Sequence, residues 1–166
     1  AEKAIREAEK EKLEVLDARN VKLEIVGPKE QGYAEYIESL IKKNKLGNRI
    51  KILEPIYDIK EKIKKIDSAK IFVLPSRVEG MPQALIEAMA RERIVIGSDS
   101  IAIRDLIKNK ENGYLFEFDN PKDLARVINL ALSESSAKIK ENASKSVRDF
   151  NWDNIIEKIE EVIQQK

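Results

Sequence analysis

Hydrophobic and polar residues follow one another along the chain in two kinds of pattern. In some segments apolar residues recur every three or four positions, which is the spacing of a helix with one buried face. In others they alternate with polar residues or form short continuous runs, which is typical of strands. The first pattern predicts helices over residues 1–18, 33–43, 59–66, 82–91, 103–109 and 121–132, followed by two more near the end. The second pattern predicts strands over residues 21–26, 49–53, 69–74, 94–97 and 113–118.

The predicted strands and helices alternate, and the strand at 69–74 is apolar almost throughout. A continuous apolar strand is typical of a parallel sheet that is covered on both faces. We therefore expect an α/β fold: a doubly wound, three-layer parallel sheet with helices on both faces. The 166 residues suit a single domain, 1–166, because a chain of this length buries roughly 70% of its unfolded surface. In such folds ligands bind outside the carboxyl ends of the strands.

The composition excludes several classes of chemistry. The chain has no histidine and no cysteine, so these residues cannot form thiolate nucleophiles, disulfides, Cys/His zinc sites or Ser-His-Asp relays. With 31 Lys and Arg against 30 Asp and Glu, the net charge of +1 gives no reason to expect a nucleic-acid partner.

No apolar run approaches the roughly 20 residues of a membrane span, and the charged start is unlike a signal peptide, so we expect a cytoplasmic protein. The high content of Lys, Glu and Ile resembles that of proteins from hot environments.

The segment most informative about function follows the strand at 69–74 and leads into the next helix. Pro82 suits the first helical position, because the amide hydrogen that proline lacks has no intrahelical partner there. The amides of Gln83 and Ala84 would then point out of the helix start, where unsatisfied donors and the helix dipole favour a phosphate. Gly80 lets the backbone approach a ligand closely, because it has no Cβ atom.

Two glutamates flank this helix start. Glu87 lies five residues beyond Pro82, about 7.5 Å along the helix axis. This offset suits a carboxylate that binds the ribose of a nucleotide whose diphosphate lies on the helix end. Glu79, just before the helix, would face the other end of the phosphates and accept hydroxyl groups of an attached sugar. Taken alone, each glutamate also fits the description of an ordinary solvated surface acid.

These residues resemble the signature of the family 4 glycosyltransferases, which are retaining enzymes with the GT-B fold. The family's motif has the frame P-S-x-x-E-G-x-P-x-x-x-x-E-A-M-A, in which seven residues separate the two glutamates. The matching positions are Pro75, Ser76, Glu79, Gly80, Pro82, Glu87, Ala88, Met89 and Ala90. The resemblance continues at residues 23–27, 69–74, 112–116 and 150–153, and so covers nearly the whole chain.

The resemblance implies a Rossmann-like fold and a donor-binding site. It implies that Glu79 is the catalytic residue that contacts the transferred sugar, and that Glu87 binds the ribose of a UDP, GDP or ADP moiety. The implied donor-binding residues are Glu79, Gly80, Met81, Pro82, Gln83, Ala84 and Glu87. Such enzymes move a hexose-type sugar from a nucleotide-diphosphate sugar to an acceptor hydroxyl. They need no divalent metal and no other cofactor, because helix dipoles and basic side chains neutralise the departing diphosphate.

The resemblance also identifies the chain as the carboxyl-terminal lobe of such an enzyme, with the amino-terminal acceptor lobe absent. Aligning Ala4 to Ala8 with the end of the family's first helix places the first strand, and the Arg and Lys that neutralise the diphosphate, upstream of Ala1. We therefore expect a fragment that binds donor weakly and shows no turnover alone. Saccharide or lipid-linked acceptors would bind the absent lobe, and lipid acceptors would bring the parent protein to the cytoplasmic face of a membrane.

Three departures from the family's pattern favour a different hypothesis. The family usually has a glycine where this chain has Glu54, a Cys-Gly-like pair at Arg91-Glu92 and Gly-Gly at Ile101-Ala102. Side chains at the last pair would project toward the diphosphate. The lobe would then be a non-catalytic scaffold or interaction module. A third hypothesis is a phosphate-binding α/β domain of another class, such as a receiver or an epimerase-like fold.

Two further groups of residues have both a structural and a functional interpretation. Four arginines near strand ends are either phosphate ligands or ordinary surface charges: Arg77, Arg91, Arg93 and Arg104. Phe150 and Trp152 are expected to anchor the terminal helix by apolar burial, since stacking on a nucleotide base would be a rarer use of such a pair.

Overall fold

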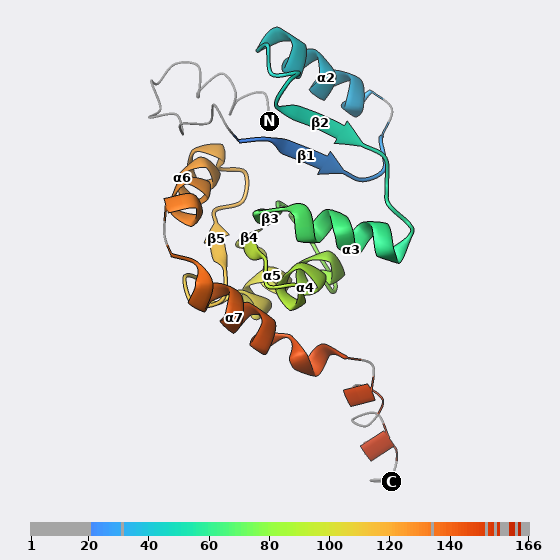
Figure 1. Ribbon diagram of the computed structural model, residues 1–166, viewed down its shortest axis with the longest axis vertical. Coiled ribbons are helices and arrows are strands. Elements are labelled where there is room, and N and C mark those ends of the chain that lie inside the picture. Colours follow the sequence, from blue (N-terminus) through green and yellow to red (C-terminus); the bar gives the residue numbers. More distant parts are fainter. Residues whose placement is uncertain are drawn as a thin grey trace. The chain divides into compact units, whose positions relative to one another are not determined.

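The computed structural model describes residues 21–30, 32–133, 135–151, 153, 154, 156, 160, 161 and 163 (Figure 1). The helix predicted over residues 1–18 lies outside this part of the chain. The described residues fall into two compact units. We call the described residues from 21 to 65 the two-stranded unit and those from Ile66 onward the three-stranded unit.

The two-stranded unit contains a small parallel sheet and a helix. Strand β1 (Leu23–Val26) pairs in parallel with β2 (Ile50–Leu53) along its whole length. Helix α2 (Tyr33–Lys43) begins and ends where the sequence predicts. No described residue of this unit is buried, and in β1 the side chains of Leu23 and Ile25 are 46% and 40% exposed. The sheet is therefore too small to enclose a core of its own.

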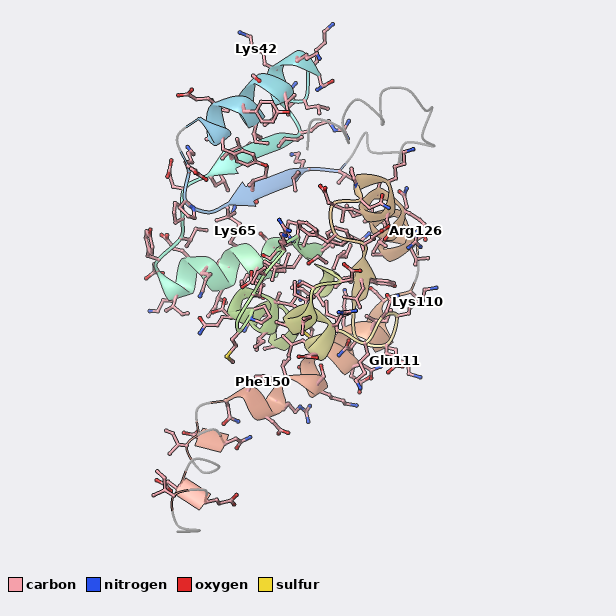
Figure 2. All side chains as sticks on the ribbon, turned by 180° about the vertical axis from the view of Figure 1, so that it is seen from behind. Lys42, Lys65, Lys110, Glu111, Arg126 and Phe150 are labelled. Atoms are coloured by element: carbon pink, nitrogen blue, oxygen red, sulfur yellow. The ribbon has the colours of Figure 1, made fainter. Side chains whose placement is uncertain are left out.

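Helix α3 (Ile59–Ser68) begins in the two-stranded unit and ends in the three-stranded one. Lys65, labelled in Figure 2, forms an ion pair with Glu24 of β1, with 3.1 Å between Nζ and Oε2. Near the end of the helix, Ile66 is buried in the core of the three-stranded unit. The predicted helix ended at this residue, and the observed one continues for two residues more.

The three-stranded unit contains a parallel sheet with the strand order β3-β4-β5. The strands are β3 (Ile71–Leu74), β4 (Ile94–Ser98) and β5 (Tyr114–Phe116). The helices are α4 (Gln83–Ala90), α5 (Ile101–Leu106), α6 (Pro121–Ser133) and α7 (Ala137–Ser146), and a 3-10 turn follows at Arg148–Phe150. The predicted strands are confirmed, with bounds that differ by at most two residues at either end.

Strand β4 is the centre of the hydrophobic core, and all five of its residues are buried. Because side chains alternate along a strand, Ile94 and Ile96 face one side of the sheet and Val95 faces the other. Ile94 and Ile96 pack with Tyr114 and with residues of α6. Val95 packs with residues of α4, α5 and α7. Helices therefore cover both faces of this sheet, which confirms the predicted α/β class.

A glycine in β4 lets helix α5 pack closely on the sheet. A Cβ atom on Gly97 would come within 2.4 Å of Ile103 Cγ2 and 3.0 Å of Ile107 Cδ1. The helix begins at Ile101, two residues earlier than predicted. Ser100, the residue before it, has the extended backbone of an N-cap, with φ −68° and ψ 154°. The short predicted helix was therefore placed too late along the chain.

The buried side chain of Asn112 closes the connection between α5 and β5. Its Oδ1 accepts from the amide of Lys108 at 2.8 Å, and its Nδ2 donates to the carbonyl oxygen of Leu106 at 3.0 Å. Nδ2 also lies 3.0 Å from Ser146 Oγ in α7. Because the side chain takes these backbone groups, α5 ends at Leu106 and does not reach Asn109 as predicted.

At the end of the described chain, Phe150 lies in the 3-10 turn and is labelled in Figure 2. Its side chain is 40% exposed, so the predicted anchoring by apolar burial is wrong for Phe150, and its predicted partner Trp152 lies outside the described residues. Within the part of the chain that the structure describes, every helix is too short or too polar to cross a lipid bilayer.

Candidate functional site

Most of the predicted site residues lie at the carboxyl end of the three-stranded sheet. Strand β3 ends at Leu74, and the chain then runs through residues 75–82 into α4. The neighbouring strand β4 ends beside it, because Leu74 lies opposite Gly97 in the parallel register. The loop after β3 therefore lies at the edge where sheets of this class bind ligands.

Helix α4 begins at Gln83, one residue later than predicted. Pro82 has φ −78° and ψ 72°, close to the values of an inverse γ-turn, and the Gln83 amide donates to the carbonyl oxygen of Met81 at 2.8 Å. The Pro82 carbonyl oxygen then accepts from the amides of Leu85 and Ile86 at 3.0 and 3.1 Å. Pro82 thus precedes the helix, and the turn engages the Gln83 amide that the sequence predicted to be free.

In the described part of the chain, two features of the backbone around this helix start leave room for a ligand: an amide without an acceptor and a glycine without close neighbours. The Ala84 amide has no acceptor among the described residues, so it is the donor that the first turn of α4 still offers. At Gly80, a Cβ atom would meet no other atom within 4 Å, and φ lies outside the left-handed region. The described fold therefore has neither a steric nor a conformational need for glycine at this position.

The two predicted glutamates are both half-buried. Glu79 lies in the loop, and Glu87 lies in the second turn of α4. Glu87 follows Gln83 and Ala84 by four and three positions, so these three residues share one face of the helix. The other face packs against the sheet through fully buried residues: Leu85, Ala88 and Met89. The helix is thus held by its apolar face, while Glu87 lies on the other face and the open amide of Ala84 points out of the helix start.

Ile101 and Ala102, where the resemblance leads us to expect Gly-Gly, form the first turn of α5. The Ile101 side chain is 74% exposed and follows β4 at the same carboxyl end of the sheet as Glu79. Its branched side chain therefore occupies space at this edge that glycine would leave open.

Glu54, another of the departures, lies in the two-stranded unit and forms an ion pair with Lys29 at 2.6 Å, which raises the pKa of the Lys29 ammonium.

Ser98 and Asp99 connect the loops of this edge, and neither is among the site residues that the sequence predicts. Ser98 is fully buried, and its hydroxyl donates to the carbonyl oxygen of Ser76 in the loop after β3. The Asp99 carboxylate accepts from the amide of Phe118 at 3.0 Å, just after β5. The sequence does contain a signal that could have identified them: both are polar residues directly after the predicted strand at 94–97. A polar group that is buried at such a position requires a hydrogen-bond partner.

Two of the four candidate arginines have structural roles. The guanidinium of Arg91 donates two hydrogen bonds to the Asp67 carboxylate, one of them 2.8 Å from Nε to Oδ1, and so holds the pKa of Asp67 below its ordinary value. Arg93 donates to the carbonyl oxygens of Asp67 and Arg91 at 3.0 and 2.8 Å. Arg77 and Arg104 are exposed.

Among the described residues, no group of three Asp, Glu, His or Cys side chains could hold a metal ion.

Solved structures of other proteins share the fold of this chain. A crystal structure of Alr3699/HepE from Anabaena in complex with UDP and glucose has a TM-score of 0.76 and 24% identity, covering 88% of this chain and 41% of that one. The C-terminal domain of LpcC, a glycosyl transferase group 1 family protein from Francisella tularensis, has a TM-score of 0.64 and 28% identity, covering 72% of this chain and 63% of that one. The first of these similarities shows a common GT-B type of fold.

The sequence comparisons agree with this likeness. An N,N'-diacetylbacillosaminyl-diphospho-undecaprenol alpha-1,3-N-acetylgalactosaminyltransferase from Campylobacter jejuni is 33% identical over 93 residues, which are 55% of this chain and 24% of that enzyme. The chain spans between 20% and 37% of the length of the curated relatives that it matches. The sequence model of the family described as glycosyl transferases group 1 matches residues 3–149. Since this match covers most of the chain, the chain belongs to the glycosyl transferases group 1 family.

Proposed function

We propose that this chain is the carboxyl-terminal, donor-binding lobe of a retaining family 4 glycosyltransferase. The complete enzyme would move a hexose-type sugar from a nucleotide-diphosphate sugar to an acceptor hydroxyl. The observation that carries the proposal is the open position of Gly80, in a loop at the carboxyl edge of the sheet, next to a helix start with an open amide at Ala84. Gly27 and Gly47 are equally open, but Gly80 lies in the loop that leads into α4, where a ligand on the helix start would lie against the backbone.

In this proposal the chain binds the donor and orients its anomeric carbon. The Ala84 amide and the dipole of α4 hold a phosphate, as helix amino termini do for anions in general. Glu87, on the same helix face, binds the ribose, and Glu79 contacts the transferred sugar. Backbone groups from Gly80 to Ala84 complete the donor site. The contribution to catalysis is then positional and electrostatic, and it needs no nucleophile from this chain.

The proposal extends to the partners and the location of the enzyme. The donor is a UDP-sugar or GDP-sugar, which the UDP complex of the Anabaena protein supports. The acceptor is a saccharide or a lipid-linked saccharide, which the name of the Campylobacter relative supports, and it binds an amino-terminal lobe outside these residues. Transfer needs no metal and no cofactor. The parent protein works in the cytoplasm, at the inner face of the membrane where its acceptor is lipid-linked. The Francisella domain supports the assignment as a C-terminal lobe.

A substitution at Gly80 tests the donor site directly. We expect the chain to bind UDP-glucose weakly in an NMR titration, and Gly80→Ala to raise the Kd about tenfold, because the new methyl group would project into the ligand's space. The melting temperature should not change, since the methyl meets no atom of the chain. The matched control is Gly27→Ala, another open glycine with ordinary φ, in the two-stranded unit. Equal affinity of the Gly80→Ala variant and the unchanged chain would contradict the proposed site.

A second measurement tests whether the donor site and the acceptor site lie on different lobes. We expect the chain alone to show no sugar transfer from UDP-sugar or GDP-sugar to saccharide acceptors, because the acceptor site would lie on the other lobe. Measurable turnover by these 166 residues would contradict this part of the proposal.

The exposed side chain of Ile101 favours one alternative, a non-catalytic lobe that serves as a scaffold. If the side chain blocks the diphosphate, neither the chain nor the full-length parent protein will bind UDP, GDP or ADP sugars. The double substitution Ile101→Gly and Ala102→Gly should then create binding. If the unchanged chain already binds donor, the alternative fails. The hypothesis of a phosphate-binding domain of another class is excluded by the family match.

A further inference from the structure

The loop that carries Glu79 and Gly80 is attached to the neighbouring strand by one buried hydroxyl. In the parallel ladder, Leu74 of β3 lies opposite Gly97 of β4, and this is the last register pair. The next residue is Pro75, which has no amide hydrogen and cannot donate to β4. The Ser98 hydroxyl continues the connection instead, by donating to the Ser76 carbonyl oxygen. A side chain therefore takes over where the backbone ladder ends.

Burial makes this hydrogen bond specific. Ser98 has no exposed surface, so its hydroxyl cannot exchange Ser76 for bulk water. Ser98 Oγ also lies 3.5 Å from Ser100 Oγ, and Ser100 is the residue before α5. This separation is longer than that of an ordinary O–H···O hydrogen bond, so the bond to Ser76 is the interaction that holds the Ser98 hydroxyl.

The other end of the loop is also anchored. Pro82 is buried, and its carbonyl oxygen accepts from the amides of Leu85 and Ile86 in α4, whose apolar face packs on the sheet. Residues 77–81, which include Glu79 and Gly80, therefore lie between an anchor at Ser76 and an anchor at Pro82. A loop held at both ends loses less conformational freedom when it binds a ligand, and this strengthens binding.

From these contacts we infer that Ser98 is a positioning residue for the proposed donor site. Through Ser76 it sets where Glu79 and Gly80 stand, without touching the donor itself. The inference rests on the proposed function only where it concerns donor binding. The anchoring of the loop is a separate claim, and an exposed arginine within the loop, Arg77, allows it to be measured without any donor.

Native-state proteolysis and a binding titration together test the inference. Trypsin cleaves after Arg77, and cleavage at the Arg77–Val78 bond can be followed by mass spectrometry relative to cleavage after Arg126 in α6. We expect Ser98→Ala to raise the relative cleavage rate at Arg77 severalfold. We also expect it to raise the Kd for UDP roughly fivefold, the factor that corresponds to one net hydrogen bond.

Two further variants separate positioning from a general loss of stability. Ser98→Thr keeps the hydroxyl and should restore both the cleavage rate and the Kd. Asn112→Ala is the matched control, because it also removes a buried polar group with hydrogen-bond partners, Lys108 and Leu106, but between α5 and β5 and not in the loop after β3. Its melting temperature should fall at least as much as that of Ser98→Ala, with no change in cleavage at Arg77 or in the Kd for UDP.

The outcomes distinguish the two proposals. If Ser98→Ala leaves cleavage at Arg77 unchanged, or changes it no more than Asn112→Ala does, the positioning role is overturned. If cleavage rises while the Kd for UDP stays the same, the loop is anchored by Ser98 but its position does not serve the donor, which also overturns the inference. If the unchanged chain binds no UDP while cleavage still rises with Ser98→Ala, the proposed donor site fails and the anchoring role stands.

Discussion

The two units of this chain differ in how completely they bury apolar residues of similar pattern. In the three-stranded unit, β4 is buried along its whole length and helices pack on both of its faces. In the two-stranded unit, no described residue is buried, and β1 exposes Leu23 and Ile25. An apolar alternating segment therefore predicts a strand but not its burial, because burial depends on the number of strands and helices that surround it.

The largest effect that would sharpen this contrast is a cavity in the core. Leu85→Ala should lower the free energy of unfolding by about 3 kcal/mol, because Leu85 is fully buried between α4 and the sheet. In the two-stranded unit, Ile52→Ala removes a half-buried side chain and should lower it by about 1 kcal/mol. Urea unfolding followed by circular dichroism measures both, and equal losses would break the comparison.

A second contrast uses glycines. Gly97→Ala should destabilise the three-stranded unit by about 2 kcal/mol, because the added Cβ would lie 2.4 Å from Ile103 Cγ2 and force α5 away from β4. In the two-stranded unit, Gly27→Ala adds a methyl group to open space, and we expect a change within about 0.5 kcal/mol. Thermal melts of the two variants provide the measurement. A large loss for Gly27→Ala would mean that the two-stranded unit is packed more tightly than its exposure indicates.

Asparagine side chains provide a third and smaller contrast. Asn112→Ala should lower the free energy of unfolding by about 2 kcal/mol or less, because the amide of Lys108 and the carbonyl of Leu106 lose the buried side chain that is their partner. Asn44→Ala, at the exposed end of α2, removes a 2.9 Å hydrogen bond to the carbonyl oxygen of Leu40. Water can replace this bond, so we expect the free energy of unfolding to fall by about a few tenths of a kcal/mol. The same urea titrations compare them, and the opposite order would contradict the proposed difference in burial.

The smallest expected effect is the pH dependence of two exposed ion pairs. The pKa of Asp67 is lowered by hydrogen bonds from Arg91, so this pair stabilises the folded state above the ordinary aspartate pKa of 3.8, and the contribution is lost as pH falls through the lower folded value. The pKa of Lys29 is raised by Glu54, so its contribution is present below 10.5 and is lost as pH rises through the higher folded value.

Both pairs are solvent-exposed, so the changes will be slight and sensitive to salt. Asp67→Asn should remove the acid-side loss in the three-stranded unit, and Lys29→Gln the alkaline loss in the two-stranded unit. Melting temperatures across pH for the two variants test this, and a loss that stays in either variant would assign it to other groups.

The sequence predicts local features of the fold well. The bounds of α2 are those predicted, and α6 extends one residue beyond its predicted end at Leu132. The helix α5 was misplaced because its start depends on the backbone of Ser100, and its end on the side chain of Asn112, which lies six residues beyond the helix. The division of the strands into two sheets depends on pairing between distant segments, which no local pattern reports.

The candidate site shows the same limit. The motif places Glu79, Gly80 and Glu87 on the loop and helix where the structure has them. It does not reveal that the Gln83 amide is engaged by a γ-turn, because that turn depends on the backbone angles at Pro82. It also does not reveal Ser98, whose importance comes from contact with Ser76, a residue twenty-two positions away along the chain.

The exposed strand β1 also affects how the chain behaves in concentrated solution. Among the described residues it pairs with β2 on one side only, and its apolar side chains Leu23 and Ile25 are exposed. Such strands are templates for pairing between copies and thus for aggregation. Lys22 and Glu24 place charges within this strand, and burying them between copies would cost free energy, which opposes such aggregation.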